Sequence, residues 1–230
     1  TGGGTTRYVD NGIVLQNSGS VTEFANNITS IISTNTNNVT AHKAMLMTNW
    51  RKQNVQSQYN TVAVVASPYL FVGAPFFGIS VSNCWEGSNG GNFIKNNTVS
   101  GFYSPVSGSD PGLDGNLKAI VLSLSGQFRV QCNVTSYTVR GIEFSGGNPS
   151  TSFRNNTMSN HRYGFVLEQN GVIGAQGTST VYPDNIWSGT WFSDHYKTAV
   201  LGGSSAQNSK ITSRHLTNYN PNGSAQSTTL

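Results

Sequence analysis

The amino-acid sequence predicts an all-β protein, a right-handed parallel β-helix (a solenoid) of about six coils with an asparagine ladder. Three observations lead to this fold. A short apolar phrase recurs after 22 and then 23 residues in the middle of the chain, asparagines recur between its copies, and charged residues make up only 10% of the sequence. A fixed period of that length is typical of proteins that stack one short coil on the next.

The recurring phrase is a small residue followed by an alternating apolar strand. Its copies begin at Gly12, Ala44, Gly78, Ala119, Gly141, Gly164 and Thr198. Alternate side chains of a strand point to the same face, so the second and fourth positions of each copy are expected to point inwards. Stacked coils then form two apolar files, Ile79, Ile120, Ile142 and Phe165 in one and Val81, Leu122, Phe144 and Leu167 in the next.

An asparagine followed by a small or β-branched residue marks a second place in each repeat. The predicted ladder comprises Asn27, Asn60, Asn97, Asn133, Asn156 and Asn185. Their spacings are 33, 37, 36, 23 and 29 residues, so the tight coil has about 22–23 residues and the excess lies in loops. Asparagine tolerates the left-handed conformation of turns, and stacked asparagines can hydrogen-bond to one another. Crossovers between parallel strands are expected to be right-handed.

The predicted domain is one β-helix over residues 1–209, with a loop insertion near 101–115. Solenoid insertions emerge on one face, which is often the binding face. The aromatic stretch 68–77 is expected to be either a core strand or an exposed contact face. Residues 210–230 are polar and are expected to form a tail or a last coil.

Composition excludes several classes of protein. The net charge is +4 and no run of Lys or Arg occurs, which argues against a nucleic-acid partner. No apolar run is long enough to span a bilayer, so no membrane span is expected. Two cysteines, Cys84 and Cys132, cannot form a disulfide framework. They are expected to be either a single bridge or two small buried residues.

Residues 161–177 (HRYGFVLEQNGVIGAQG) and 183–189 (PDNIWSG) resemble the last coils of secreted or cell-surface parallel β-helix proteins of Bacteroidetes. Proteins of that kind are often type IX secretion cargo with a C-terminal sorting domain. The resemblance extends from about Ala119 to Gly189. It implies an extracellular or cell-surface location, but no shared catalytic motif. It also implies that the chain is a fragment of a longer protein or has lost a sorting domain.

Catalysis by a β-helix polysaccharide hydrolase requires clustered carboxylates. Glu143 and Glu168 fall on outward strand positions in adjacent coils, although not in the same file. A lyase would also need a base and a cation that neutralises a uronate. Histidine and arginine suit these roles, so the candidates are His161, Arg154 and Arg162, with Arg129 and Arg140 nearby. The alternative interpretation is that these are solvated surface residues.

No cofactor is expected from the sequence, apart from a weak calcium candidate. Asp110 and Asp114 lie in a glycine-rich loop and supply oxygen atoms, which Ca²⁺ prefers. Their spacing matches no complete calcium loop, so a plain polar turn is the alternative. The four histidines show no zinc spacing.

The sequence therefore supports two functions from different classes. The first is an extracellular non-enzymatic module, a structural, adhesive or filament-forming protein that contacts other chains or glycans, including copies of itself through the open ends of the solenoid. The second is a polysaccharide lyase or glycoside hydrolase that acts on an extracellular polysaccharide. A trimeric phage-type tail fibre is a further possibility.

Overall fold

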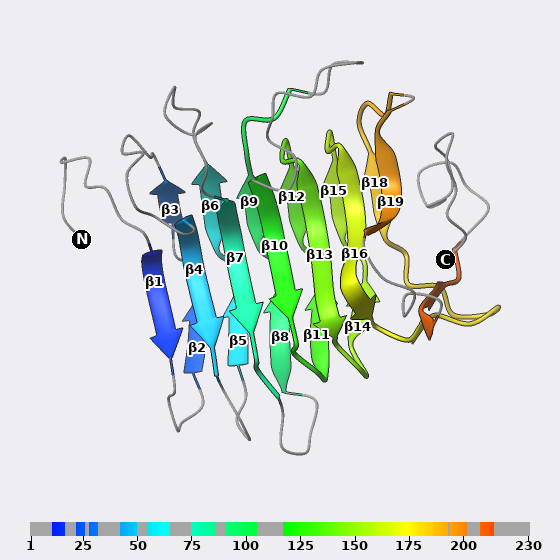
Figure 1. The fold of residues 1–230 in the computed structure, drawn as a ribbon, viewed down its shortest axis with the longest axis horizontal. Helices are drawn as coiled ribbons and strands as arrows, with labels where there is room; N and C mark the ends of the chain where they lie inside the picture. The colour runs from blue at the N-terminus through cyan, green and yellow to red at the C-terminus, as the bar shows by residue number, and fades with distance from the viewer. Residues whose placement is uncertain are drawn as a thin grey trace.

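The computed structural model describes residues 11–16, 22–25, 28–31, 42–49, 55–64, 75–85, 91–104, 117–192, 194–201 and 208–213. Asn27, Asp110, Asp114 and the chain beyond residue 213 lie outside these ranges, as does most of the predicted insertion. The described residues are all-β, and their strands stack in parallel sheets (Figure 1).

Three parallel sheets contain almost all of these strands. Sheet A consists of β1 (Asn11–Gln16), β4 (His42–Thr48), β7 (Phe76–Ser82), β10 (Leu117–Ser123), β13 (Arg140–Gly147), β16 (Tyr163–Val172) and β19 (Tyr196–Leu201). Sheet B consists of β2 (Thr22–Ala25), β5 (Val55–Gln58), β8 (Asn92–Lys95), β11 (Phe128–Gln131) and β14 (Ser152–Arg154). Sheet C consists of β3 (Ile28–Ile31), β6 (Thr61–Val64), β9 (Thr98–Ser100), β12 (Val134–Ser136), β15 (Thr157–Ser159) and β18 (Ile186–Ser188).

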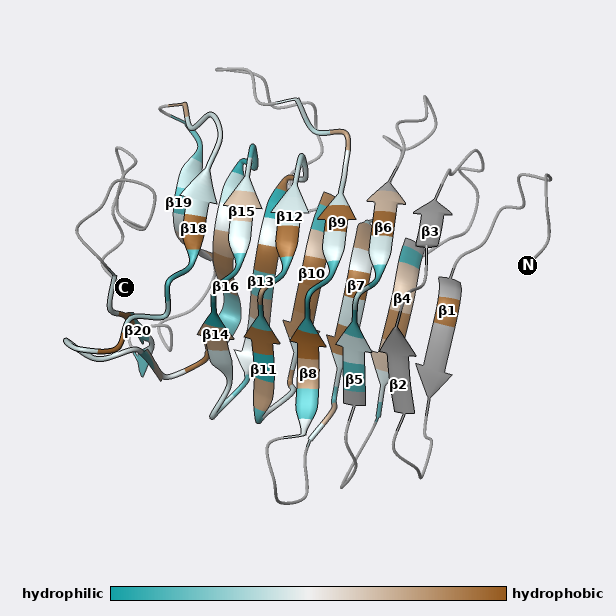
Figure 2. Ribbon diagram, turned by 180° about the vertical axis from the view of Figure 1, so that it is seen from behind, coloured by the Kyte–Doolittle hydropathy of each residue, from teal (hydrophilic) through white to brown (hydrophobic). Residues whose placement is uncertain are grey.

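The chain visits the three sheets in rotation, so that every third strand returns to the same sheet beside its predecessor. Sheet A forms one layer, and sheets B and C lie end to end in a second layer, which is in front of sheet A in the view of Figure 2. Two short strands, β17 (Ala175–Gln176) and β20 (Lys210–Ile211), pair separately, the second of them in the segment predicted as a tail or last coil. This arrangement is compatible with the predicted parallel β-helix.

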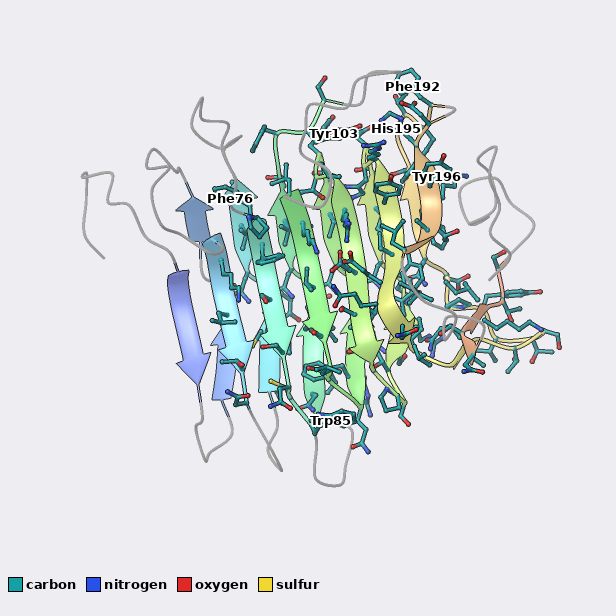
Figure 3. All side chains as sticks on the ribbon, in the orientation of Figure 1. Phe76, Trp85, Tyr103, Phe192, His195 and Tyr196 are labelled. Atoms are coloured by element: carbon teal, nitrogen blue, oxygen red, sulfur yellow. The ribbon has the colours of Figure 1, made fainter. Side chains whose placement is uncertain are left out.

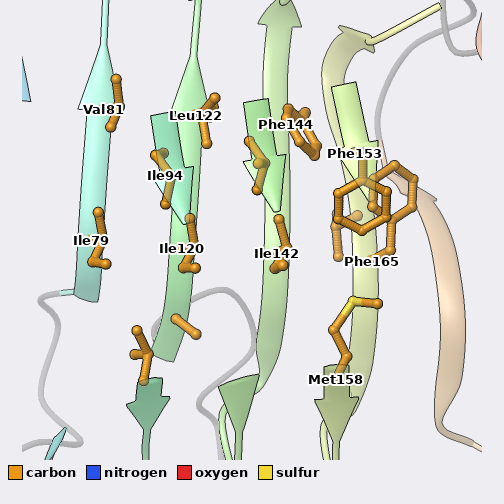
Figure 4. Close-up of a cluster of buried hydrophobic side chains, with 14 of the residues drawn as sticks. Ile79, Val81, Ile94, Ile120, Leu122, Ile142, Phe144, Phe153, Met158 and Phe165 are labelled. Atoms are coloured by element: carbon orange, nitrogen blue, oxygen red, sulfur yellow. The ribbon is translucent and has the colours of Figure 1, made fainter. Parts of the chain in front are cut away.

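The apolar files lie between the two layers, as the alternation predicted. Ile120 pairs in register with Ile79 on one side and Ile142 on the other, and Ile142 pairs with Phe165. All four are fully buried. Phe144, Phe153 and Phe165 widen the core at its C-terminal half (Figure 4), with ring centroids of Phe153 and Phe165 only 4.9 Å apart. Each such buried side chain contributes about 2 kcal/mol.

The asparagines form a continuous hydrogen-bonded row between sheets B and C. From Asn60 to Asn185, each amide nitrogen donates to the amide oxygen of the next asparagine at 2.9 Å. Each backbone N–H donates to that same oxygen at 3.0–3.1 Å. Asn97, Asn133, Asn156 and Asn185 also donate to a carbonyl at the end of a sheet B strand. The row therefore satisfies backbone groups where the chain turns.

The residue before each of these asparagines has a left-handed backbone. Its φ lies between 50° and 56° at Tyr59, Asn96, Cys132, Asn155 and Asp184. This conformation aims the next side chain into the core and costs most residues about 1 kcal/mol, but costs asparagine less. The turn that follows a sheet A strand has the same left-handed backbone conformation at Asn49, Asn83 and Leu124.

The two cysteines form no disulfide, and only one of them is buried. Cys84 is fully buried, but Cys132 is exposed because it occupies a left-handed turn position just before Asn133. Both alternatives predicted for the pair, a bridge or two buried residues, are therefore wrong.

The outer edge of β14 is closed by side chains rather than by another strand. Phe153 N–H donates to Oε1 of Gln176 at 2.8 Å, and Nε2 of Gln176 donates to the carbonyl of Thr151 at 2.8 Å. Asn185 donates to the carbonyl of Phe153 at 2.9 Å. Two amide side chains thus make the bonds that a sixth strand of sheet B would make.

Candidate functional site

The two predicted carboxylates come together on the outer side of sheet A. Glu143 lies on β13 and pairs in register with Val166, whereas Glu168 lies on β16 beside Ser145. Their neighbours Ile142, Phe144 and Leu167 point into the core, which places both carboxylates on the opposite face. The hypothesis that both are solvated is wrong for Glu143, which is only 1% exposed.

Lys118 and Arg140 hold both carboxylates in one cluster of ion pairs. The Lys118 ammonium lies 2.8 Å from Oε1 of Glu143 and 3.4 Å from Oε2 of Glu168. Nη1 of Arg140 donates to Oε2 of Glu143 at 2.7 Å and also to Oε2 of Glu168. Two cations therefore balance two anions, and the cluster is neutral as a unit.

The environments of the two carboxylates push their pKa values in opposite directions. Burial raises the pKa of Glu143, although Lys118 and Arg140 oppose this effect. Burial acts the same way on Glu168, but Lys118, Glu143 and Arg140 outweigh it and lower the pKa of that carboxyl. Divergent values are characteristic of acid–base pairs. Here, however, the carboxylate with the raised pKa, Glu143, is enclosed and engaged with two cations.

Arg154, Arg162 and His161 are not part of this cluster. Arg154 lies on β14 of sheet B, and Arg162 lies just before β16 with its guanidinium 5.4 Å from the ring centroid of Tyr163. Of the arginines predicted nearby, Arg140 alone joins the carboxylates, and sequence reasoning missed Lys118 altogether. The available signal was register, since Lys118 pairs with Arg140 one repeat later.

His161 is a fully buried structural residue. Its Nε2 lies 3.0 Å from the Thr135 hydroxyl, and its Nδ1 lies 2.9 Å from the Thr138 hydroxyl. Burial lowers its pKa to about 4, against the opposing effect of hydrogen bonds with Thr138 and Thr135. The imidazole is therefore neutral at physiological pH, and its exposed fraction is zero. A substrate cannot reach it in this conformation.

A second buried histidine makes a contact that the sequence did not predict. The hydroxyl of Tyr103 lies 2.7 Å from Nε2 of His195, and Nδ1 of His195 lies 2.9 Å from the Asp194 carboxylate. Figure 3 shows Tyr103, His195 and Phe192 gathered at one end of the strands. The chain Asp–His–hydroxyl has the order of a proton relay. Tyr103 is only 2% exposed and His195 is fully buried, so the contact ties segments together instead.

A pocket of about 490 Å³ adjoins the closed edge of β14. Arg154 lines it together with Ser152, Gln176 and Tyr182. The pocket is separate from the carboxylate cluster, because its walls come from residues within 150–154, which include β14, and within 173–182, which include β17. Of the predicted catalytic candidates, Arg154 is the one that lines this pocket.

Within the described ranges, no three His, Cys, Asp or Glu side chains lie close enough together to hold a metal ion. The calcium candidates Asp110 and Asp114 fall outside those ranges. None of the described residues forms a helix long and apolar enough to cross a membrane.

Comparison of the chain with protein-family models, with curated proteins and with solved structures finds no match in any of the three.

Proposed function

We propose that this chain is a right-handed parallel β-helix of about six coils that serves as a non-enzymatic structural or adhesive module outside the cell or at its surface. The rotation of the chain through three parallel sheets supports the fold. The Bacteroidetes resemblance supports the location. In this proposal, the β-helix presents rigid outer faces to extracellular glycans or to other protein chains.

The state of the carboxylate cluster is the observation that carries the proposal. A glycoside hydrolase needs one carboxyl group that can deliver a proton and another that can reach the sugar or a water. Glu143 is enclosed, and Lys118 and Arg140 engage both of its oxygens. A buried, balanced ion-pair cluster is a typical structural element, and the loss of one partner is costly. The cluster therefore fits a role in holding β10, β13 and β16 together.

Self-assembly through the ends of the stack belongs to the same proposal, with one restriction. The edge of β14 is closed by Gln176 and Asn185, so it offers no free backbone groups to another chain at those positions. Filament formation would therefore use other edges or the side faces. Light scattering across a concentration series measures this, and a particle that remains monomeric throughout would remove filament formation from the proposal.

The test of function is one incubation with neutral and acidic polysaccharides, scored both for retention of the protein and for new reducing or unsaturated chain ends. We expect retention on at least one polysaccharide without new ends. New ends that disappear in Glu143→Gln would overturn the non-enzymatic assignment. Absence of retention and of assembly together would overturn the adhesive and structural roles.

The opposed pKa directions of Glu143 and Glu168 favour a second candidate function, hydrolysis or β-elimination of an extracellular polysaccharide. In that case Glu143 would hold the proton and Glu168, whose side chain is 21% exposed, would face the substrate. The same incubation separates the two functions, because this one requires cleavage that both Glu143→Gln and Glu168→Gln abolish.

A further inference from the structure

The outer face of sheet B is basic over its three C-terminal strands. Alternate residues of β8, β11 and β14 enter the core, namely Ile94, Val130 and Phe153. The outward positions between them are Phe93, Lys95, Arg129, Gln131, Ser152 and Arg154. This face therefore combines three cations, two hydrogen-bonding side chains and one aromatic ring, with no acidic residue among the six.

The arginines of this face are not neutralised by a neighbour. Arg129 and Arg154 are both exposed, and neither forms an ion pair within the described part of the chain. Sheet A differs in this respect, because its cations Lys118 and Arg140 form ion pairs with Glu143 and Glu168. Glu23, an acidic residue of sheet B, lies three strands away from Arg129. The register pairs Glu23 with Gln56, Gln56 with Phe93, and Phe93 with Arg129.

Register sets the spacing of the three cations. Lys95, Gln131 and Arg154 are consecutive partners across β8, β11 and β14, so the Cα atoms of Lys95 and Arg154 lie about 10 Å apart, two strand spacings. Arg129 lies two residues before Gln131, about 7 Å along the strand. The cations thus form a triangle about one or two sugar residues wide.

The face continues into the pocket beyond β14. Ser152 and Arg154 belong both to the outer face and to the walls of the 490 Å³ pocket, which Gln176 and Tyr182 also line. No strand of the described chain fills this space, because the side chain of Gln176 closes the edge of β14. An elongated ligand can therefore cross sheet B and place one end in the pocket.

We infer that the outer face of sheet B and its adjoining pocket bind a linear acidic polysaccharide, with Arg129 and Arg154 holding its carboxylates. This inference rests on the proposed function as a glycan-contacting module. Arginine binds carboxylates through paired N–H donors. The amide of Gln131 and the hydroxyl of Ser152, which lie 3.3 Å apart, suit the hydroxyls of a sugar.

The aromatic residue of this face argues against a nucleic acid as the ligand. Lys95 lies 5.0 Å and Arg129 5.2 Å from the ring centroid of Phe93. The cations thus occupy the ring that a nucleobase would need for stacking. Three spaced charges also match a polymer with widely spaced carboxylates better than a dense phosphate backbone.

Affinity electrophoresis of the whole chain in gels that contain polygalacturonate tests the inference. Arg129→Gln and Arg154→Gln are each expected to weaken binding about tenfold, the loss of one charge-assisted contact. Lys43→Gln removes the same charge from sheet A and is the matched control, with an expected change below about twofold. Binding should weaken as salt increases and should be lost on fully methyl-esterified polymer.

Each other outcome overturns the inference in a distinct way. If Lys43→Gln weakened binding as much as the arginine substitutions do, the binding would depend only on the net charge of the protein. If the methyl-esterified polymer retained the protein equally well, the carboxylates of the polymer would play no part in binding. Tighter binding to a single-stranded oligonucleotide would make a nucleic acid the ligand. If the wild-type chain is retained but both arginine variants bind normally, the sheet B site is wrong while the adhesive function stands. New chain ends would overturn the non-enzymatic function but leave the arginine comparison valid.

Discussion

Substitution of Asn133 by alanine tests the asparagine row most directly. The Asn133 side chain makes four hydrogen bonds: it accepts from the backbone and side chain of Asn97, and it donates to Asn156 and to the carbonyl of Ile94. Asn133 is fully buried, so water cannot replace these partners. At about 1 kcal/mol for each bond, Asn133→Ala should reduce the free energy of unfolding by about 4 kcal/mol.

Urea unfolding followed by circular dichroism measures this loss. With a slope of about 3 kcal/mol per molar urea, the midpoint should fall by about 1.3 M. Val134→Thr is the matched control, because Val134 is the next residue, is 43% exposed and keeps a β-branched side chain in the variant. It should change stability by less than about 0.5 kcal/mol. A midpoint for Asn133→Ala that equals that of the control would refute the role assigned to the row.

Three further predictions concern other buried or strained positions. Burial lowers the folded-state pKa of His161 to about 4, below its ordinary 6.5. The contribution of His161 to the free energy of unfolding should therefore be fully present above pH 6.5 and should fall by up to about 3 kcal/mol towards pH 4. In urea titrations, His161→Gln should lose the part of this pH dependence between pH 6.5 and 4.5. Glu143→Gln should cost about 3 kcal/mol in thermal unfolding at pH 7, since Arg140 and Lys118 lose a buried counter-charge, and Glu168→Gln should cost less because it is partly exposed; equal losses would contradict this. Leu124→Asn should stabilise the protein by about 1 kcal/mol, because φ at Leu124 is 48°, a conformation that asparagine tolerates better than leucine. Asparagines already occupy the equivalent positions 83 and 49, where their side chains hydrogen-bond to each other at 2.7 Å. Val134→Asn, in an extended strand, is the control and should give no gain in melting temperature.

The repeat made the stacked part of the fold predictable. Once two copies of the apolar phrase are aligned, the partners of Ile120 and Leu122 follow, because each coil can bury its apolar side chains only against its neighbours. The same alignment placed the asparagines in a row. Sequence therefore determined which backbones lie side by side wherever the period is regular.

Contacts between side chains of unlike type were not predictable in this way. The cluster depends on how far Lys118 and Arg140 reach across neighbouring strands, and a period constrains Cα positions but not the ends of long side chains. Burial of Glu143 follows from that reach as well. Its position suggested exposure, because alternation distinguishes the two faces of a strand but does not show what covers the outer one.

The bond between Tyr103 and His195 gives the stack a property that nearest-neighbour packing lacks. In an ordinary solenoid each layer interacts only with the adjacent ones, so unfolding can begin at an end and proceed one layer at a time. Here a residue just after β9 is joined to one just before β19, across 92 positions and past β12 and β15. The last layer cannot fray without breaking a contact made near the middle. The C-terminal half should therefore open as one cooperative block, with similar hydrogen-exchange protection from β9 to β19.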